Sequence, residues 1–184
     1  MNEALQLLQQ RNSAARLTEP APEASELDAI FRAAVRAPDH GLLRPWRFIV
    51  IEGDNRQALG DLFVKAQPSA PDEKREKLRL NPLRAPMIIV VVASPQSHVK
   101  IPLNEQQLSA ACAAHAILLA SEALGYAGIW RTGDVAYDPV VKHGLGLKDM
   151  ESIIGFLYLG TRSGESKPLD IPDISALVTH WPGL

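Results

Sequence analysis

The 184-residue chain has very little cysteine: Cys112 is the only one. A single cysteine excludes an intrachain disulfide and any metal cluster built on several thiolates. The histidines show no metal-ligand spacing with one another or with Cys112, so a metal hydrolase is not expected. They lie at His40, His98, His115, His143 and His180.

Long hydrophobic runs and an excess of charge of one sign are also absent. The longest strictly apolar run, Ala85 to Ala93, is too short to span a bilayer, and the N-terminus lacks the basic start and apolar core of a signal peptide. The formal net charge is only -2, which gives no field that would attract nucleic acid. We therefore expect a cytoplasmic protein that binds neither membrane nor nucleic acid.

Familiar nucleotide-binding signatures are missing as well. No Gly-x-Gly-x-x-Gly occurs, since Gly144-Leu-Gly146 fails at the last position, and a Rossmann dinucleotide fold has little support. Gly160-Thr-Arg-Ser-Gly164 is neither a phosphate loop nor a nucleophile elbow. With 46% hydrophobic residues in 20.1 kDa, the chain has enough apolar material for one globular domain, residues 1–184.

Lysine is absent before Lys65, where every cation other than histidine is an arginine. A guanidinium binds phosphate through a rigid fork, so this bias favours phosphate or planar-anion recognition; ordinary surface charge is the alternative. The most informative stretch is Arg36-Ala-Pro-Asp-His40, followed by Arg44-Pro-Trp-Arg-Phe48. It predicts a stiff loop that holds cations and an aromatic plane at the end of a buried strand.

Hydrophobic periodicity predicts a mixture of helices and strands. The uninterrupted run Met87 to Val92 is typical of a central strand covered on both faces. The segment from Gln67 to Arg84 reads as a mobile flap with a short helix, and the tail from Arg162 to Leu184 as an extended arm. The other expected elements are helices over Glu26–Arg36 and Asn104–Leu124, strands over Arg47–Glu52 and Ile153–Leu159, and a short helix starting at Asp138-Pro139.

Cys112 and His115 lie one turn apart on the long predicted helix and could form a thiol nucleophile with its base. Such a pair would make a thiol hydrolase. Apolar residues share that face, so we interpret the two side chains as a small buried thiol and a core histidine.

Trp130-Arg131-Thr132-Gly133 combines an aromatic plane, a cation, a hydroxyl and a glycine after the long helix. Together with Arg11-Asn12-Ser13 and with Arg36 to His40, it provides what flavin mononucleotide (FMN) needs. These requirements are cations for the phosphate, polar groups for the ring edge and apolar planes for the isoalloxazine.

The ordered set of these motifs resembles the FMN-dependent nitroreductase family, and most closely its small YdjA-like branch. The motifs are Leu7-Leu-Gln-Gln-Arg-Asn-Ser13, Arg36–His40, Pro45–Phe48, the alanine-rich helix, Gly128–Gly133 and Gly155–Gly160. The resemblance implies an α+β fold with a central mixed sheet packed by helices, assembled as an intertwined homodimer. Because the extended C-terminal arm carries many large apolar residues, we expect each arm to lie across the partner.

By the same resemblance, FMN would be bound at the subunit interface by Arg11, Asn12, Ser13, Arg36, His40, Trp130, Arg131 and Thr132. Relatives often carry a second arginine where this chain has Asn12. The implied activity passes reducing equivalents from NADH or NADPH to a nitroaromatic, a quinone or a similar small acceptor by a ping-pong mechanism, with no protein nucleophile. A flavin-binding or storage module without turnover is the alternative.

Overall fold

The strands form one five-stranded sheet in a computed structural model that describes residues 2–183. β5 (Ser152–Arg162) is the longest strand and pairs with β3 (Met87–Ala93), β4 (Ala127–Arg131) and β1 (Leu17–Thr18). β2 (Trp46–Glu52) pairs with the other side of β3, from Trp46 opposite Ala93 to Glu52 opposite Met87. The helices are α1 (Glu3–Gln10), α2 (Ala24–Ala34), α3 (Asn55–Ala66), α4 (Asp72–Leu80), α5 (Leu103–Ala123) and α6 (Pro139–Gly144).

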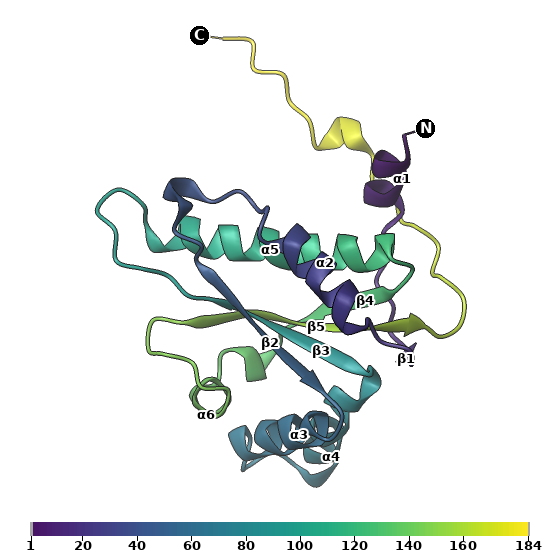
Figure 1. Cartoon of the computed structure of the whole chain (residues 1–184), viewed down its shortest axis with the longest axis vertical. Coiled ribbons are helices and arrows are strands. Elements are labelled where there is room, and N and C mark those ends of the chain that lie inside the picture. Colours follow the sequence, from purple (N-terminus) through teal and green to yellow (C-terminus); the bar gives the residue numbers. More distant parts are fainter. Residues whose placement is uncertain (1, 184) are drawn as a thin grey trace.

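All strand pairs among residues 2–183 are antiparallel, whereas the sequence led us to expect a mixed sheet. The chain leaves β2 and enters β3 at the same end of the sheet, with α3 and α4 as the connection, so the two strands run in opposite directions (Figure 1). α5 does connect two strands that run in the same direction, β3 and β4. β5 lies between them, so the two never pair. The α+β architecture itself is confirmed.

β3 divides the core into two layers. Its alternate side chains Ile89 and Val91 pack with α2 and α5 on one face of the sheet. Ile88 and Val90 pack on the other face with residues of α3 and α6. Every residue of β3 is buried, which confirms the prediction of a central strand covered on both faces.

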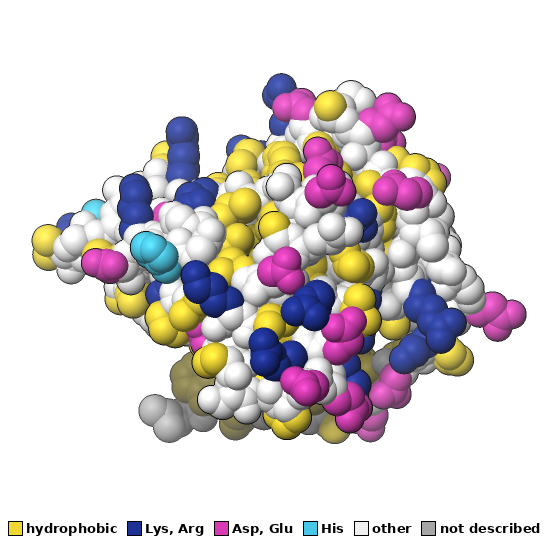
Figure 2. Space-filling view, turned by 90° about the horizontal axis from the view of Figure 1, so that it is seen from below, with side chains coloured by type: hydrophobic (Ala, Val, Ile, Leu, Met, Phe, Trp, Pro, Cys, Tyr) yellow, Lys and Arg dark blue, Asp and Glu magenta, His cyan; other side chains and the backbone are white. Residues whose placement is uncertain are grey.

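The segment predicted as a mobile flap is docked against the body of the molecule. α4 packs on α3 at the bottom of Figure 1, and an added Cβ at Gly60 of α3 would collide with the main-chain oxygen of Arg79. Figure 2 shows acidic and basic side chains intermingled on this face of the molecule. Several are paired, as in the bond from Arg79 Nε to Asp61 Oδ1 at 3.1 Å.

The chain after β5 leaves the body of the molecule (Figure 1). Residues 164–183 are exposed and contain one short 3-10 turn, Ile174–Ala176. Large apolar side chains along it are open to solvent: Ile171 is 77% exposed and Trp181 is 80% exposed. None of the helices within residues 2–183 is long and apolar enough to cross a membrane.

Candidate functional site

Trp130 is held flat on the sheet by its neighbours in β5. Its indole Nε1 donates to the main-chain oxygen of Ile154 at 3.2 Å. Gly155 makes this possible, because a Cβ at that position would occupy the space of the indole ring. The side chain lies on the α2/α5 face, where it forms part of the wall of a groove along α5.

Arg131 points to the opposite face of the sheet, as strand alternation requires. Its guanidinium carbon lies 5.7 Å from the ring centroid of Tyr158, and burial raises the pKa of that phenol to about 12. Among residues 2–183 the buried Arg131 Nε has no hydrogen-bond partner. The cavity beside it, about 290 Å³, is also lined by Thr132 and Asn81. Trp130 and Arg131 are therefore adjacent in sequence but do not share one cavity through their side chains.

The main chain of β4 offers a second kind of contact. The carbonyl of Gly128 accepts a hydrogen bond from the N–H of Ala14 at 3.1 Å, on the edge away from β5. In an antiparallel ladder alternate residues direct their main-chain groups to the same side, so Trp130 also presents its main-chain groups at this free edge. The free edge of β4 thus carries further main-chain polar groups on the C-terminal side of Gly128, where Ala14 binds.

The Arg11–Ser13 segment lies beside the start of β4 because Ala14 anchors it there. Arg162 donates from Nη2 to the main-chain oxygen of Asn12 at 2.9 Å. The side-chain amide of Asn12 donates to the main-chain oxygen of Lys167 at 2.6 Å, so it holds the segment that follows β5. Nearby, Glu122 of α5 has a raised pKa because burial outweighs the opposing charges of Arg162 and Arg11.

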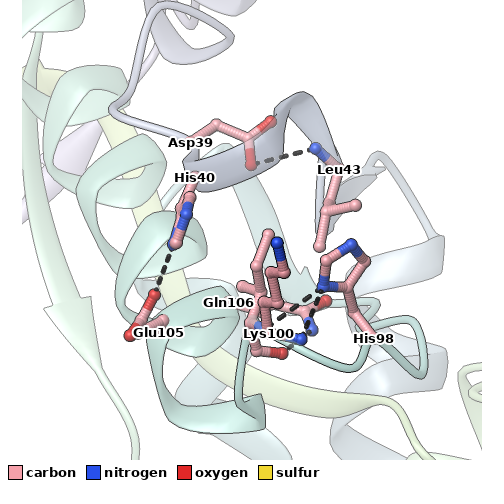
Figure 3. A network of polar contacts seen from close by, with 8 residues as sticks. Asp39, His40, Leu43, His98, Lys100, Glu105 and Gln106 are labelled. Atoms are coloured by element: carbon pink, nitrogen blue, oxygen red, sulfur yellow. Dashed lines mark hydrogen bonds and ion pairs between the residues drawn. The ribbon is translucent and has the colours of Figure 1, made fainter.

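His40 lies at the other end of α5. Its Nδ1 is 2.8 Å from Glu105 Oε2, in the first turn of that helix (Figure 3). Both side chains are largely exposed. Glu105 and Glu122 are 17 positions apart, which is about 25 Å along a helix. A single chain therefore keeps His40 and the Arg11–Ser13 segment at opposite ends of α5.

Arg36 lies between these two ends. It follows α2 and borders the groove of about 570 Å³ that Trp130 and the exposed face of α5 also line. It also borders a second cavity, next to Arg44 and Trp46. The structure thus brings Arg36 together with Trp130, and adds Arg44, which was not among the predicted site residues.

The exposed face of α5 corrects one prediction. Cys112 and His115 are exposed within the chain and do not pack into its core. They belong to a stripe with alternating spacings of three and four residues, which puts its members on one side of the helix. The stripe is Glu105, Leu108, Cys112, His115, Leu119 and Glu122. α5 has a second apolar face, with Ala110, Ala113, Ala114 and Ile117, and this face makes the intrachain core.

Comparison with known proteins gives a consistent result along the whole chain. The family model described as "Nitroreductase family" matches residues 8–161. The Escherichia coli K12 protein named "Putative NAD(P)H nitroreductase YdjA" is 42% identical over 182 residues, which is 97% of this chain and 100% of that relative.

Solved structures share the fold. A nitroreductase-like family protein from Bacillus cereus superposes with a TM-score of 0.86 at 22% identity, covering 100% of this chain and 98% of that one. A nitroreductase with bound FMN from Desulfitobacterium hafniense DCB-2 gives a TM-score of 0.72 at 22% identity, covering 98% and 99%. Given the family match over most of its length and the 42% identical relative, the chain belongs to the Nitroreductase family.

Proposed function

We propose that this protein is an FMN-dependent oxidoreductase that passes reducing equivalents from NADH or NADPH to electron-poor small molecules such as nitroaromatics or quinones. The observation that carries the proposal is the docking of the Arg11–Ser13 segment on β4 through the Ala14–Gly128 hydrogen bond. It keeps the Arg11–Ser13 segment, with its cation and hydroxyl, next to the edge of β4 that faces away from β5. The name of the 42% identical relative, an NAD(P)H nitroreductase, supports the same activity.

The residues present fit FMN in their chemistry. Arg11 and Arg36 supply guanidiniums for a phosphate, and Asn12 and Ser13 lie beside Arg11. The main-chain groups of Trp130 suit the polar edge of a flavin ring, and Thr132 directly follows β4. The remaining predicted residues are Arg131, whose main chain lies on the same strand, and His40.

FMN, when bound, supplies the redox chemistry that no side chain of the protein can perform. The protein's part is to hold the ring, exclude water from one side of it and leave one face open. Donor and acceptor then use the same open face in turn, which predicts ping-pong kinetics.

We further propose that the site is completed by a second copy of the chain. The exposed stripe of α5 runs from Leu108 to Leu119 and has no partner among residues 2–183. If two α5 helices pair antiparallel about the middle of this stripe, Glu122 of one copy lies beside Glu105 of the other. Arg11, which lies near Glu122, then approaches the His40 of the second copy. The homodimer thereby brings together the two ends that one chain keeps about 25 Å apart.

The test is direct. Purified protein should be yellow with flavin absorbance bands, and should oxidise NADH or NADPH steadily when a quinone is supplied. Double-reciprocal plots at several acceptor concentrations should be parallel. A protein that binds FMN but gives no steady-state turnover with any donor would be a flavin-binding or storage module instead.

The assembly is tested by truncation after Gly164, which removes the exposed segment that the second copy would cover. We expect the truncated protein to lose both dimerisation and tight FMN binding, since the two are thermodynamically linked. Added FMN should raise the melting temperature of the full chain. A truncated protein that runs as a monomer on sizing yet keeps full FMN affinity would exclude the shared site.

A further inference from the structure

A cavity of about 570 Å³ lies between the end of α2 and the start of β2. Arg36 and Arg44 line it, together with Trp46 and Leu42. Leu42 is 78% exposed, so its apolar side chain is open to a ligand in the cavity. The cavity thus combines two cations with apolar walls.

The two cations are not used within the chain. Among residues 2–183, neither Arg36 nor Arg44 has a carboxylate within 4.0 Å of its guanidinium. Asp39 also borders the cavity, but its two oxygens accept the main-chain N–H groups of Leu43 at 3.2 Å and Arg44 at 2.7 Å. The carboxylate is therefore engaged in shaping the loop, and the cavity retains a net positive charge.

The loop that carries Arg44 has a strained backbone. Leu42 has a φ of 54° and Arg44 a φ of 50°, next to Gly41 at 73°. Residues with side chains rarely adopt this left-handed region, and Arg44 also precedes Pro45, which further restricts its conformation. Such strain persists only where the surrounding structure imposes it, and it gathers at binding and catalytic sites.

A hydrogen-bond network anchored on the buried Gln106 holds this conformation. Gln96 donates from its side-chain amide to the main-chain oxygen of Leu43 at 2.9 Å. Gln96 is itself fixed by Gln106, which is 2% exposed and bonds both the N–H and the carbonyl of Gln96 at 2.9 Å. Figure 3 shows the Asp39–Leu43 contact within the loop and the His40–Glu105 contact that attaches the loop to the start of α5. The backbone conformation at Arg44 is thus held by the protein itself before any ligand arrives.

We propose that Arg36 and Arg44 form a phosphate-binding site in which Arg44 is a dedicated anion-recognition residue. The inference rests on the proposed function, because the phosphate belongs to a nucleotide: either FMN or the nicotinamide donor. Two guanidiniums match the charge of a phosphate dianion, and each can bind it through two parallel N–H groups. Trp46 and Leu42 offer the apolar surface that the rest of a nucleotide needs.

The experiment compares Arg44→Gln and Arg44→Lys with the wild type. Arg32→Gln is the matched control, since Arg32 lies on α2, is 78% exposed and pairs only with Asp28. Two quantities are measured: the Kd of FMN for the flavin-free protein, from quenching of flavin fluorescence, and the KM values for NADPH and NADH with the flavin-loaded protein. Arg44→Gly is added because glycine adopts a positive φ without strain, so it removes the cation and leaves the loop folded.

We expect Arg44→Gln and Arg44→Gly to weaken one of these interactions about ten- to a hundred-fold, with Arg44→Lys in between and Arg32→Gln unchanged. A higher Kd for FMN assigns the site to the flavin phosphate. A higher KM for NADPH but not for NADH assigns it to the 2′-phosphate of the donor, and an equal rise for both assigns it to the diphosphate.

The inference is overturned if all three Arg44 variants keep the wild-type Kd and both wild-type KM values. That result leaves the proposed function intact, because the wild type still binds flavin and turns over. A wild-type protein that binds no FMN and oxidises neither donor overturns the proposed function itself.

Discussion

The ion pair between Arg47 and Glu151 provides a quantitative test of how the structure is held together. Glu151 is 3% exposed and lies just before β5. Its carboxylate accepts from Arg47 Nε at 2.8 Å, from Arg47 Nη2 at 2.7 Å and from the N–H of Lys148 at 2.9 Å. Arg47 Nη2 also donates to the carbonyl of Gly146 at 3.0 Å. The pair therefore fastens β2 to the segment between α6 and β5.

The pKa of Glu151 gives the size of the effect. The hydrogen bonds from Arg47 lower this pKa from 4.5 to about 2, against the opposing effect of burial, and the Lys148 N–H contributes. A fall of this size corresponds to about 3 kcal/mol of folding free energy. Because the folded pKa is depressed, this stability is present above about pH 4.5 and is lost as the pH falls toward 2.

Arg47→Met leaves Glu151 buried without its cation, so we expect the free energy of unfolding at pH 7 to fall by about 3–5 kcal/mol. Glu151→Gln should cost less, about 1–3 kcal/mol, since Arg47 is 36% exposed and can turn to water. Urea unfolding followed by circular dichroism measures both. Without Arg47 the pKa of Glu151 rises, so the deficit of Arg47→Met should shrink between pH 7 and pH 4.5.

Arg79→Met is the control, because Arg79 pairs with Asp61 and Glu76 on the surface and each of these pairs contributes little. A loss below about 1 kcal/mol for Arg47→Met, or a loss that does not change with pH, would refute the reasoning.

Three further predictions concern the site. Arg11→Ala should raise the Kd of FMN about ten- to a hundred-fold, and an unchanged Kd by fluorescence titration would remove Arg11 from the site. Gly155→Ala should displace the Trp130 indole, shift its fluorescence and cost about 1–3 kcal/mol in urea unfolding; an unshifted emission spectrum would contradict the packing described. Cys112→Ala should keep turnover nearly intact, and a large loss of activity in folded, flavin-loaded protein would favour a thiol mechanism.

Much of the fold could be predicted because its strongest elements have clear local patterns. The run of apolar, mostly β-branched residues predicted a strand that is buried on both faces of the sheet. β3 is such a strand. α5 begins and ends within one residue of its prediction, since Gly125 ends the helical pattern. β1 escaped prediction because its two residues carry no periodicity, and its pairing with β5 depends on residues far along the chain.

The exposure of Cys112 could not be predicted for a different reason. α5 is apolar on two sides, so its periodicity does not tell which side faces the core of its own chain. For the candidate site, motifs predicted Arg11, Arg36 and Trp130, and these remain predictions. The separation of Trp130 from the Arg131 side chain follows from strand alternation, which the motifs do not show. The proposed role of Arg44 is suggested by the left-handed backbone of its loop, which no sequence motif indicates.

The position of β5 has a consequence for the order of folding. This central strand is the last strand of the chain, yet it pairs with β1, β3 and β4. During synthesis β2 and β3 can pair early, but β4 has no neighbour until residues 152–162 have left the ribosome. Until β5 has been made, the edges of β3 and β4 that will pair with it stay open. Pairing between strands that lie far apart in the sequence is also slow. Chains that end before β5 should therefore aggregate rather than fold, because one late strand closes the whole sheet.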